Sequence, residues 1–182
     1  MSQSLSPITL RAGPYTLRRF EEENLPLILA ASQDPLIPLI TTVPSPCNEA
    51  AALAFIERQH KRLRGGQGYS LAIVTTDNEA VGQIGLWPQQ HQRASIGYWV
   101  VGSGRGQGAA GQAVRAISQF ALGTAGMQRL ELYVEPWNEA SWRTSEGAGY
   151  RREGLLRQYQ RIGAERKDMY VYSLLRDDLQ RS

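Results

Sequence analysis

A glycine-rich stretch near the middle of the chain is the part of the sequence that points most directly to chemistry. Five glycines lie within ten residues, at Gly102, Gly104, Gly106, Gly108 and Gly111. The stretch follows a strand-like run at residues 94–101 and precedes a helical pattern that extends to about Leu122. The first turn of a helix leaves backbone N–H groups without partners, and glycines let an anion approach them closely. The pattern therefore predicts a site for a phosphate-bearing ligand, the alternative being a flexible surface turn.

Two familiar phosphate-binding motifs do not account for this stretch. A P-loop ends in Gly-Lys-Ser/Thr, whereas Gly108 is followed by Ala109-Ala110. The spacing Gly106-x-Gly108-x-x-Gly111 matches the glycines of a dinucleotide-binding fingerprint, but residues 126–130 contain no acid before Glu131. The expected strand order also differs from that of a dinucleotide-binding fold. These differences argue against both motifs.

The stretch does resemble the signature of a known family. Arg105-x-x-Gly108-x-Ala110 matches the Arg/Gln-x-x-Gly-x-Gly/Ala motif of the GNAT superfamily of N-acetyltransferases, and residues 96–100 resemble the strand before that motif. Asn138-x-x-Ser141, Gly149-Tyr150 and Glu153-Gly154 look like the ending of the branch that acetylates the N-termini of ribosomal proteins. The matching marks extend from residue 96 to residue 154, and the order of the expected elements fits almost the whole chain.

The resemblance implies a fold and a cofactor. The fold is α/β (α+β): a mixed, mostly antiparallel, twisted sheet with splayed central strands, flanked by helices, in one domain over residues 1–182. Acetyl-CoA lies in the gap between the splayed strands, with no metal. The residues implied for cofactor binding are Trp99, Val100, Val101, Arg105, Gly106, Gln107, Gly108, Ala109, Ala110, Gly111, Asn138 and Ser141. The backbone of residues 99–101 pairs with the pantetheine, the amides of residues 106–111 hold the pyrophosphate, and Asn138 reaches the pantetheine from the other side.

Acetyl transfer also needs help for the departing thiolate. Many members of the family carry a tyrosine four residues before the Gly-aromatic pair, and Ser145 occupies that position here. Ser141 completes the Asn-x-x-Ser motif instead. We therefore assign the hydrogen-bonding role to Ser141, the alternative being that Ser141 only caps or packs in a short helix.

A general base is harder to find in the sequence. Related enzymes often have a glutamate at the start of the strand before the motif, where this chain has Ser95. Substitutes are Glu131 and Glu135, on one face of an alternating strand, and His91, because histidine is a common general base in enzymes. Each also has an ordinary structural or solvent-exposed interpretation, and a water chain without a dedicated base is a further alternative.

The elements that must position these residues follow from periodicity and turn signals. Strands are expected at residues 15–20, 69–75, 80–87, 94–101, 129–134, 151–157 and 167–175. Helices are expected at residues 22–31, 46–63, 109–122 and 138–148. The Ser45-Pro46 pair is interpreted as the start of the second helix, with Leu53, Ile56, His60 and Leu63 on one face. The order contains an early antiparallel hairpin and a central strand–helix–strand unit.

Composition narrows the class of protein. The chain has 182 residues, is 42% hydrophobic and carries a net charge of +3 without a basic run, which favours an anionic small ligand over nucleic acid. One cysteine and two histidines build neither a disulfide framework nor a Cys/His zinc site. No run is apolar enough to span a membrane, and residues 1–10 lack the pattern of a signal peptide, so a cytoplasmic protein, monomer or homodimer, is expected.

The sequence therefore predicts an acetyl-CoA-dependent N-acetyltransferase. Its acceptor is an amine, either a protein N-terminus or a small molecule such as an antibiotic, an amino acid or a polyamine. Use of another acyl-CoA, or a non-catalytic CoA-binding or regulatory module, are the alternatives, and Ser95 and Ser145 keep the last of these open.

Overall fold

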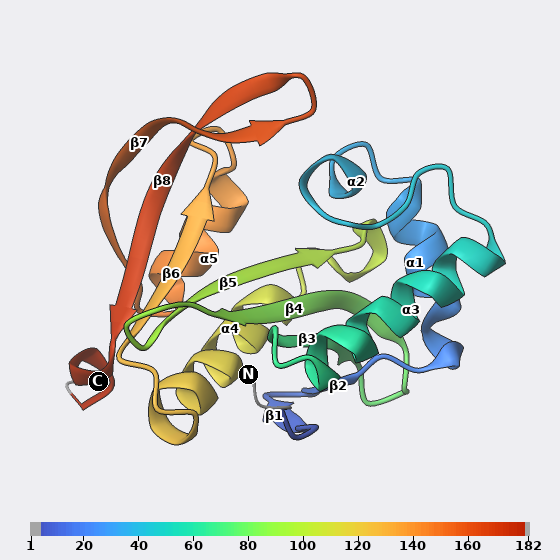
Figure 1. The fold of residues 1–182 in the computed structure, drawn as a ribbon, viewed down its shortest axis with the longest axis horizontal. Helices are drawn as coiled ribbons and strands as arrows, with labels where there is room; N and C mark the ends of the chain where they lie inside the picture. The colour runs from blue at the N-terminus through green and yellow to red at the C-terminus, as the bar shows by residue number, and fades with distance from the viewer. Residues whose placement is uncertain (1–4, 181–182) are drawn as a thin grey trace.

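The computed structural model describes residues 5–180, which form one eight-stranded sheet with helices on both faces (Figure 1). The order of strands across the sheet is β1-β2-β3-β4-β5-β6-β8-β7. Their bounds are β1 Leu10–Ala12, β2 Tyr15–Arg19, β3 Tyr69–Val74, β4 Ala80–Pro88, β5 Arg93–Val100, β6 Arg129–Val134, β7 Arg151–Ile162 and β8 Glu165–Leu175. Described neighbours pair antiparallel, except that β5 and β6 are parallel. The expected mixed, mostly antiparallel sheet is confirmed.

Five α-helices connect these strands within the described residues. They are α1 Leu25–Ser32, α2 Ile37–Ile40, α3 Glu49–Arg64, α4 Ala109–Gln119 and α5 Glu139–Gly147. A π-helical segment, Phe120–Thr124, continues α4. Short 3-10 turns occupy Glu22–Asn24, Gly102–Gly104 and Arg176–Gln180. The central unit β5–α4–β6 is the expected strand–helix–strand connection.

The start of α3 differs from the prediction based on Ser45-Pro46. The helix begins at Glu49 because the side chain of Asn48 accepts a hydrogen bond from the Ala51 amide at 2.9 Å and so caps the first turn. The buried face also differs, since it consists of Ala52, Phe55, Ile56 and Gln59, while Leu53 is exposed. The prediction therefore identified the helix and the buried Ile56, but it assigned the rest of the buried face to the wrong residues.

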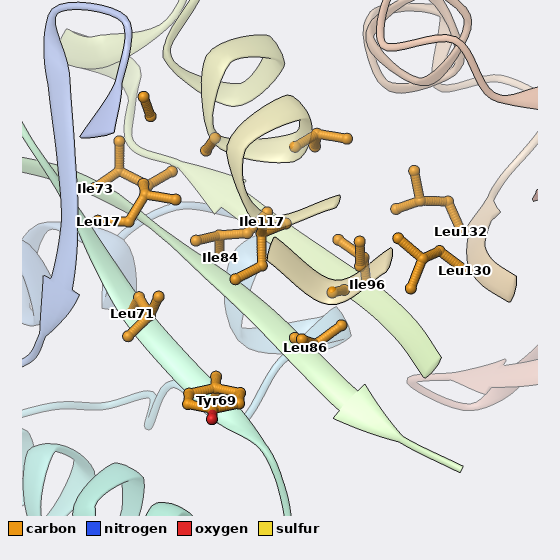
Figure 2. Close-up of a cluster of buried hydrophobic side chains, with 14 of the residues drawn as sticks. Leu17, Tyr69, Leu71, Ile73, Ile84, Leu86, Ile96, Ile117, Leu130 and Leu132 are labelled. Atoms are coloured by element: carbon orange, nitrogen blue, oxygen red, sulfur yellow. The ribbon is translucent and has the colours of Figure 1, made fainter. Parts of the chain in front are cut away.

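Helices cover the two faces of the sheet with two separate apolar clusters. On one face, α4 packs Val114 and Ile117 against strand residues such as Ile84 and Ile96 (Figure 2). On the other face, Phe55 of α3 and Ile28 of α1 pack with Val74 and Trp99. Each fully buried side chain of this kind contributes about 1.5–3 kcal/mol. These contacts hold β3, β4 and β5 rigidly between the two layers.

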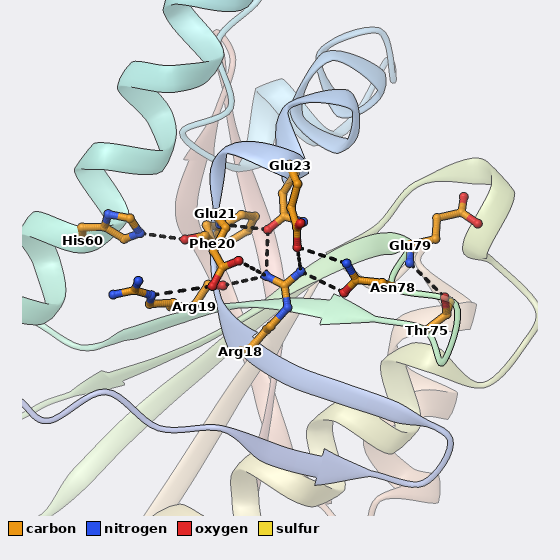
Figure 3. A network of polar contacts seen from close by, with 10 residues as sticks. Arg18, Arg19, Phe20, Glu21, Glu23, His60, Thr75, Asn78 and Glu79 are labelled. Carbon is orange, nitrogen blue, oxygen red and sulfur yellow. Dashed lines mark hydrogen bonds and ion pairs between the residues drawn. The ribbon is translucent and has the colours of Figure 1, made fainter.

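A polar network fastens the amino-terminal segment to the sheet (Figure 3). Arg18 of β2 donates to Glu23 at 2.5 Å, to Asn24 at 3.2 Å and to Asn78 in the β3–β4 turn at 3.3 Å. The His60 ring of α3 is hydrogen-bonded to the Phe20 carbonyl at 2.7 Å. The network fixes the direction in which the chain leaves β2 and enters α1.

The carboxyl-terminal hairpin is longer than the sequence indicated. β7 ends at Ile162 rather than at residue 157, and β8 begins at Glu165 rather than at residue 167. The pairing is irregular between Leu156 and Gln160, where Gln158 has a positive φ of 50°. This irregularity bends the hairpin, and Figure 1 shows its tip turned toward α2.

Candidate active site

The two parallel strands separate shortly after they begin to pair. β5 and β6 are in register only over three pairs, from Arg93 with Arg129 to Ser95 with Glu131. Beyond Ser95, the edge of β5 that faces β6 has no strand partner among residues 5–180. Figure 1 shows the carboxyl-terminal ends of the two strands diverging. The splayed central strands expected from the sequence are therefore present.

A cleft of about 450 Å³ occupies this gap. Its walls include Tyr98 and Trp99 of β5, Tyr133 and Val134 of β6, and Ser141 of α5. Alternate residues of β5 point to opposite faces of the sheet: Ile96 and Val100 belong to the α4 cluster, and Trp99 belongs to the α1–α3 cluster. The cleft is therefore lined by side chains from both faces of the sheet, Ile96 from one face and Trp99 from the other.

The glycine-rich loop lies where β5 leads into α4. Gly106 and Gly108 have positive φ values of 76° and 80°, and Gly108 is the N-cap residue of α4. A Cβ added at either glycine would meet nothing within 4 Å, so the space in front of the backbone is open. Within residues 5–180 the amides of Ala109, Ala110 and Gly111 have no backbone acceptor. Free amides at a helix N-terminus can bind an anion, as the sequence predicted.

The side chain of Arg105 is already engaged within the protein. Its Nε donates to the Val100 carbonyl at 2.9 Å, and its Nη2 lies 2.6 Å from Asp34 Oδ2. Asp34 also accepts the amides of Leu36 and Ile37. Burial acts to raise the pKa of Asp34, but these two amides and the Arg105 guanidinium outweigh it and lower that pKa. Arg105 therefore ties the glycine-rich loop to the segment between α1 and α2.

The backbone near the end of β5 is unevenly available for a ligand. The Val101 amide donates to the Val81 carbonyl at 3.0 Å, and the Val101 carbonyl accepts from the Gly104 amide. Trp99 and Val100 pair with Gln83 and Gly82 of β4 on one side only. Of the predicted 99–101 stretch, Trp99 lines the cleft, whereas the Val100 carbonyl is already bound by Arg105 Nε and the Val101 backbone is bound within the fold.

Helix α5 brings Asn138 and Ser141 to the cleft. Asn138 caps the helix by accepting the Ser141 amide at 3.1 Å, and both residues line the cleft. The Ser141 hydroxyl lies 2.8 Å from the hydroxyl of Tyr98. Ser145 is fully buried, and its hydroxyl donates to the Ser141 carbonyl at 3.0 Å. The structure thus places Ser141 at the cleft and Ser145 inside the helix packing.

The three acidic or basic candidates lie in different surroundings. Glu131 is 3% exposed and binds Arg129 Nε at 2.6 Å and the Tyr133 hydroxyl at 2.7 Å. Burial acts to raise its pKa, but those two hydrogen bonds outweigh burial and lower the pKa of Glu131. His91 is exposed in the turn before β5, at the opposite end from the glycine-rich loop. Neither lines the cleft, whereas Glu135 does.

Two buried polar atoms beside the cleft lack partners. Gln83 Oε1 and Trp99 Nε1 have no hydrogen-bond partner among the described residues. The two residues are direct cross-strand neighbours on β4 and β5, and both line the cleft. An unpaired buried polar group costs about 1–3 kcal/mol. A ligand that hydrogen-bonds to these atoms recovers that free energy.

Two absences complete the description. Among residues 5–180, no helix is long and apolar enough to cross a membrane. The same residues contain no group of three or more His, Cys, Asp or Glu side chains placed to hold a metal ion.

Tyr98 is the cleft residue that sequence reasoning missed. Strand alternation assigns its side chain to the α4 face, but its partner Ser141 is 43 residues away in the chain. Only the packing of α5 beside β5 reveals the contact.

Comparisons with known proteins agree with this geometry. The chain is 27% identical over 171 residues to a Bacillus licheniformis protein named uncharacterized N-acetyltransferase p20, covering 92% of this chain and 96% of the relative. It is similar in fold to Mycobacterium smegmatis RimJ in complex with CoA-disulfide, with a TM-score of 0.77, 22% identity, and coverage of 98% and 90% of the two chains.

A third similarity concerns a protein whose structure was solved with the expected cofactor. The microcin C7 self-immunity acetyltransferase MccE, in complex with acetyl-CoA and AMP, has a TM-score of 0.78 to this chain at 21% identity. The alignment covers 94% of this chain and 98% of the other. At these identities the solved structures show the shared fold.

The family itself is established by a family model. The model described as the acetyltransferase (GNAT) domain matches residues 15–151, which include β2 through α5 and therefore the glycine-rich loop and both walls of the cleft. The chain is an acyltransferase that belongs to the GNAT acetyltransferase family.

Proposed function

We propose that this chain transfers an acetyl group from acetyl-CoA to a primary amine. The observation that carries the proposal is the cleft between the diverging strands β5 and β6, which is lined by side chains from both faces of the sheet, while the free amides of α4 lie beyond the end of β5. This arrangement suits a long phosphorylated donor on one face and an acceptor on the other. Holding both together in reactive geometry supplies the largest part of the rate enhancement.

The cofactor side is formed by the glycine-rich loop, β5 and α5. The amides of residues 106–111 hold the pyrophosphate, since the positive φ values of Gly106 and Gly108 leave the backbone open to it. The edge of β5 next to Trp99, which has no strand partner among the described residues, pairs with the pantetheine amides, and Asn138 approaches from α5. Arg105 contributes its backbone and the position of its loop, because its guanidinium is bound to Asp34.

The chemical steps are divided between the two faces. Acetyl-CoA supplies the acetyl group as an activated thioester. Glu135 removes the proton from the incoming ammonium group, in preference to Glu131 and His91, because Glu135 alone of the three lines the cleft. A free N–H on the cleft edge of β5 stabilises the negative charge that gathers on the carbonyl oxygen. Ser141 donates a hydrogen bond to the sulfur as its bond to carbon breaks.

The acceptor approaches on the α1–α3 face. There the cleft is lined by Gln83, Trp87 and Trp99 of the sheet, by Thr41 and Thr42 after α2, and by Ile162 of the hairpin. The unpaired Gln83 Oε1 can accept a hydrogen bond from an N–H or O–H group of the amine substrate. Trp99 Nε1 can donate a hydrogen bond to an oxygen of that substrate. A protein N-terminus, whose peptide groups carry both, and a small amine with a similar pair of groups both meet these requirements.

The test of this function is turnover with a panel of amines. Purified protein is incubated with acetyl-CoA and peptides, polyamines, amino acids or aminoglycosides, and CoA release is followed with a thiol reagent while mass spectrometry identifies the acetylated product. We expect at least one amine to be acetylated, with propionyl-CoA and succinyl-CoA poorer donors. Tight binding of CoA without turnover across the whole panel would show a CoA-binding module instead.

Replacing Ser141 with alanine is expected to lower kcat by roughly ten- to a hundredfold, the size of a hydrogen bond that strengthens in the transition state. The affinity for CoA should change little, because Ser141 acts on the departing sulfur. Ser145→Ala is the matched control, since this serine lies in the same helix with its hydroxyl bound to a backbone carbonyl. Steady-state kinetics and calorimetry of both variants decide the assignment. A slower Ser145 variant, or two variants equal to the parent, would remove Ser141 from the mechanism.

A further inference from the structure

We propose that Tyr98 is a positioning residue that holds the Ser141 hydroxyl so that its hydrogen points into the cleft. The proposal rests on the function proposed above, in which Ser141 acts on the sulfur. Its basis is a contact across the cleft: the Tyr98 hydroxyl of β5 lies 2.8 Å from Ser141 Oγ of α5, and both residues line the cavity. The contact joins the two elements that form the cofactor side.

Either hydroxyl of this pair can be the donor, and we assign that role to Tyr98 because a phenol is a more acidic donor than an aliphatic alcohol. The single phenol hydrogen faces Ser141 Oγ at 2.8 Å and the Ser141 carbonyl at 3.3 Å, and the Thr144 side chain also lies within hydrogen-bonding reach. Burial raises the pKa of Tyr98, so the phenol stays protonated at neutral pH. A protonated phenol beside a serine oxygen occupies one of its lone pairs and leaves the serine hydrogen free to point elsewhere.

Three hydroxyls farther inside the helices donate to the backbone, and the Ser141 hydroxyl does not donate to it within the described residues. Ser118, Thr144 and Ser145 each donate to the carbonyl four residues earlier, at 2.6, 2.8 and 3.0 Å. This back-bonding is the usual behaviour of a serine inside a helix. Ser141 lies in the first turn of α5, where the residue four positions earlier, Trp137, precedes the cap, so its hydroxyl has no helical carbonyl to bind and is paired with Tyr98 instead. Its hydrogen is therefore not committed to the helix.

A second Tyr–Ser pair in the same protein serves as an internal reference. The Tyr150 hydroxyl lies 2.7 Å from Ser118 Oγ, and Ser118 donates to the Val114 carbonyl. Both residues are buried, at 3% and 1% exposed, and neither lines the cleft. In the core pair the serine hydrogen is bound to the backbone. In the cleft pair the serine hydrogen is available to a ligand.

The test compares Tyr98→Phe with Tyr150→Phe, which removes the corresponding hydroxyl from the reference pair. We expect Tyr98→Phe to lower kcat by about five- to tenfold with the KM for acetyl-CoA unchanged, because the Ser141 hydroxyl then loses the partner that fixes its orientation. In a Ser141→Ala background the same change should alter kcat by less than about twofold. Tyr150→Phe should lower the melting temperature and leave kcat as in the parent. Equal losses from Tyr98→Phe with and without Ser141 would overturn the proposal.

A second readout needs no turnover. The thiol of bound CoA is titrated by its thiolate absorbance in the parent and in each variant. Ser141 stabilises the thiolate, so we expect the thiol pKa to be lower in the parent than in Tyr98→Phe or Ser141→Ala, and Tyr150→Phe to match the parent. If no amine is acetylated but this order holds, the acetyl-transfer function fails and the positioning role of Tyr98 stands. A thiol pKa unchanged by Tyr98→Phe contradicts the role of Tyr98 even in an active enzyme.

Discussion

The Gly108→Asp protein is expected to fold and to lose CoA binding, with the dissociation constant raised at least about a hundredfold, or about 3 kcal/mol. Gly108 is the N-cap residue of α4 and stands beside the free amides of Ala109 to Gly111. An aspartate there occupies those amides with its own carboxylate and repels a pyrophosphate at short range. The fold tolerates the change because the space at Cβ is open and aspartate adopts left-handed backbone more readily than most residues.

The matched control for this variant is Gly126→Asp. Gly126 also has a positive φ, 75°, and open space at Cβ, but it follows the π-helical segment at the opposite end of α4. The control therefore carries the same charge and the same backbone strain without facing the proposed pyrophosphate. Calorimetry with CoA, together with circular dichroism of both proteins, gives the comparison. Unchanged affinity in a folded Gly108→Asp protein would move the cofactor away from this loop.

Glu135→Gln is expected to lower kcat/KM by about a hundredfold at pH 7, the usual contribution of a positioned general base. The deficit should narrow as the pH rises above the pKa of the acceptor amine, about 8 for an α-amino group, because the amine then arrives without its proton. A purely structural loss would be the same at every pH. Rates of the parent and the variant measured from pH 6 to pH 10 distinguish these outcomes.

Three further variants test where the base lies. Glu139→Gln changes a neighbouring exposed carboxylate that is paired with Arg143, and it should leave the rate unchanged. Glu131→Gln should reduce stability, since it removes the buried negative charge that Arg129 and Tyr133 bind and leaves one acceptor oxygen for the two of them, while affecting the pH profile little. His91→Gln should resemble the parent, because His91 lies in an exposed turn outside the cleft. A pH-dependent loss in either of the last two variants would transfer the role of base to that residue.

The parts of the fold predicted correctly are those that local patterns determine. The glycine-rich loop, the helix that follows it and the helix that starts near Asn138 each depend on residues close together in the chain. The splay of β5 and β6 followed from resemblance to a family. Periodicity alone does not reveal where two paired strands stop pairing.

The features that were missed are not marked by a pattern that periodicity can detect. Glu131 looked available as a base, but Arg93, which lies 38 residues earlier, and Arg129 hold it in a buried network. β1 was missed because three residues carry too little alternation to be recognised, and it exists by pairing with β2. The start of α3 was misplaced because the cap at Asn48 competes with the proline signal at Ser45-Pro46. For Glu131 a contact 38 residues away decided the outcome, whereas the β1–β2 pairing and the Asn48 cap are local contacts that the sequence pattern marked too weakly.

The ion pair between Arg105 and Asp34 joins the glycine-rich loop to the segment before α2, so in the proposed function it couples the two substrate sites. Asp34 anchors the segment that brings Thr41 and Thr42 to the acceptor side, while Arg105 belongs to the loop beside the cofactor. Any adjustment of one segment on binding is felt by the other through this contact. Coupling of this kind is reciprocal: if bound acetyl-CoA changes the affinity for the amine by some factor, bound amine changes the affinity for acetyl-CoA by the same factor. A single surface contact thereby bears on whether the two substrates bind in a fixed order or at random.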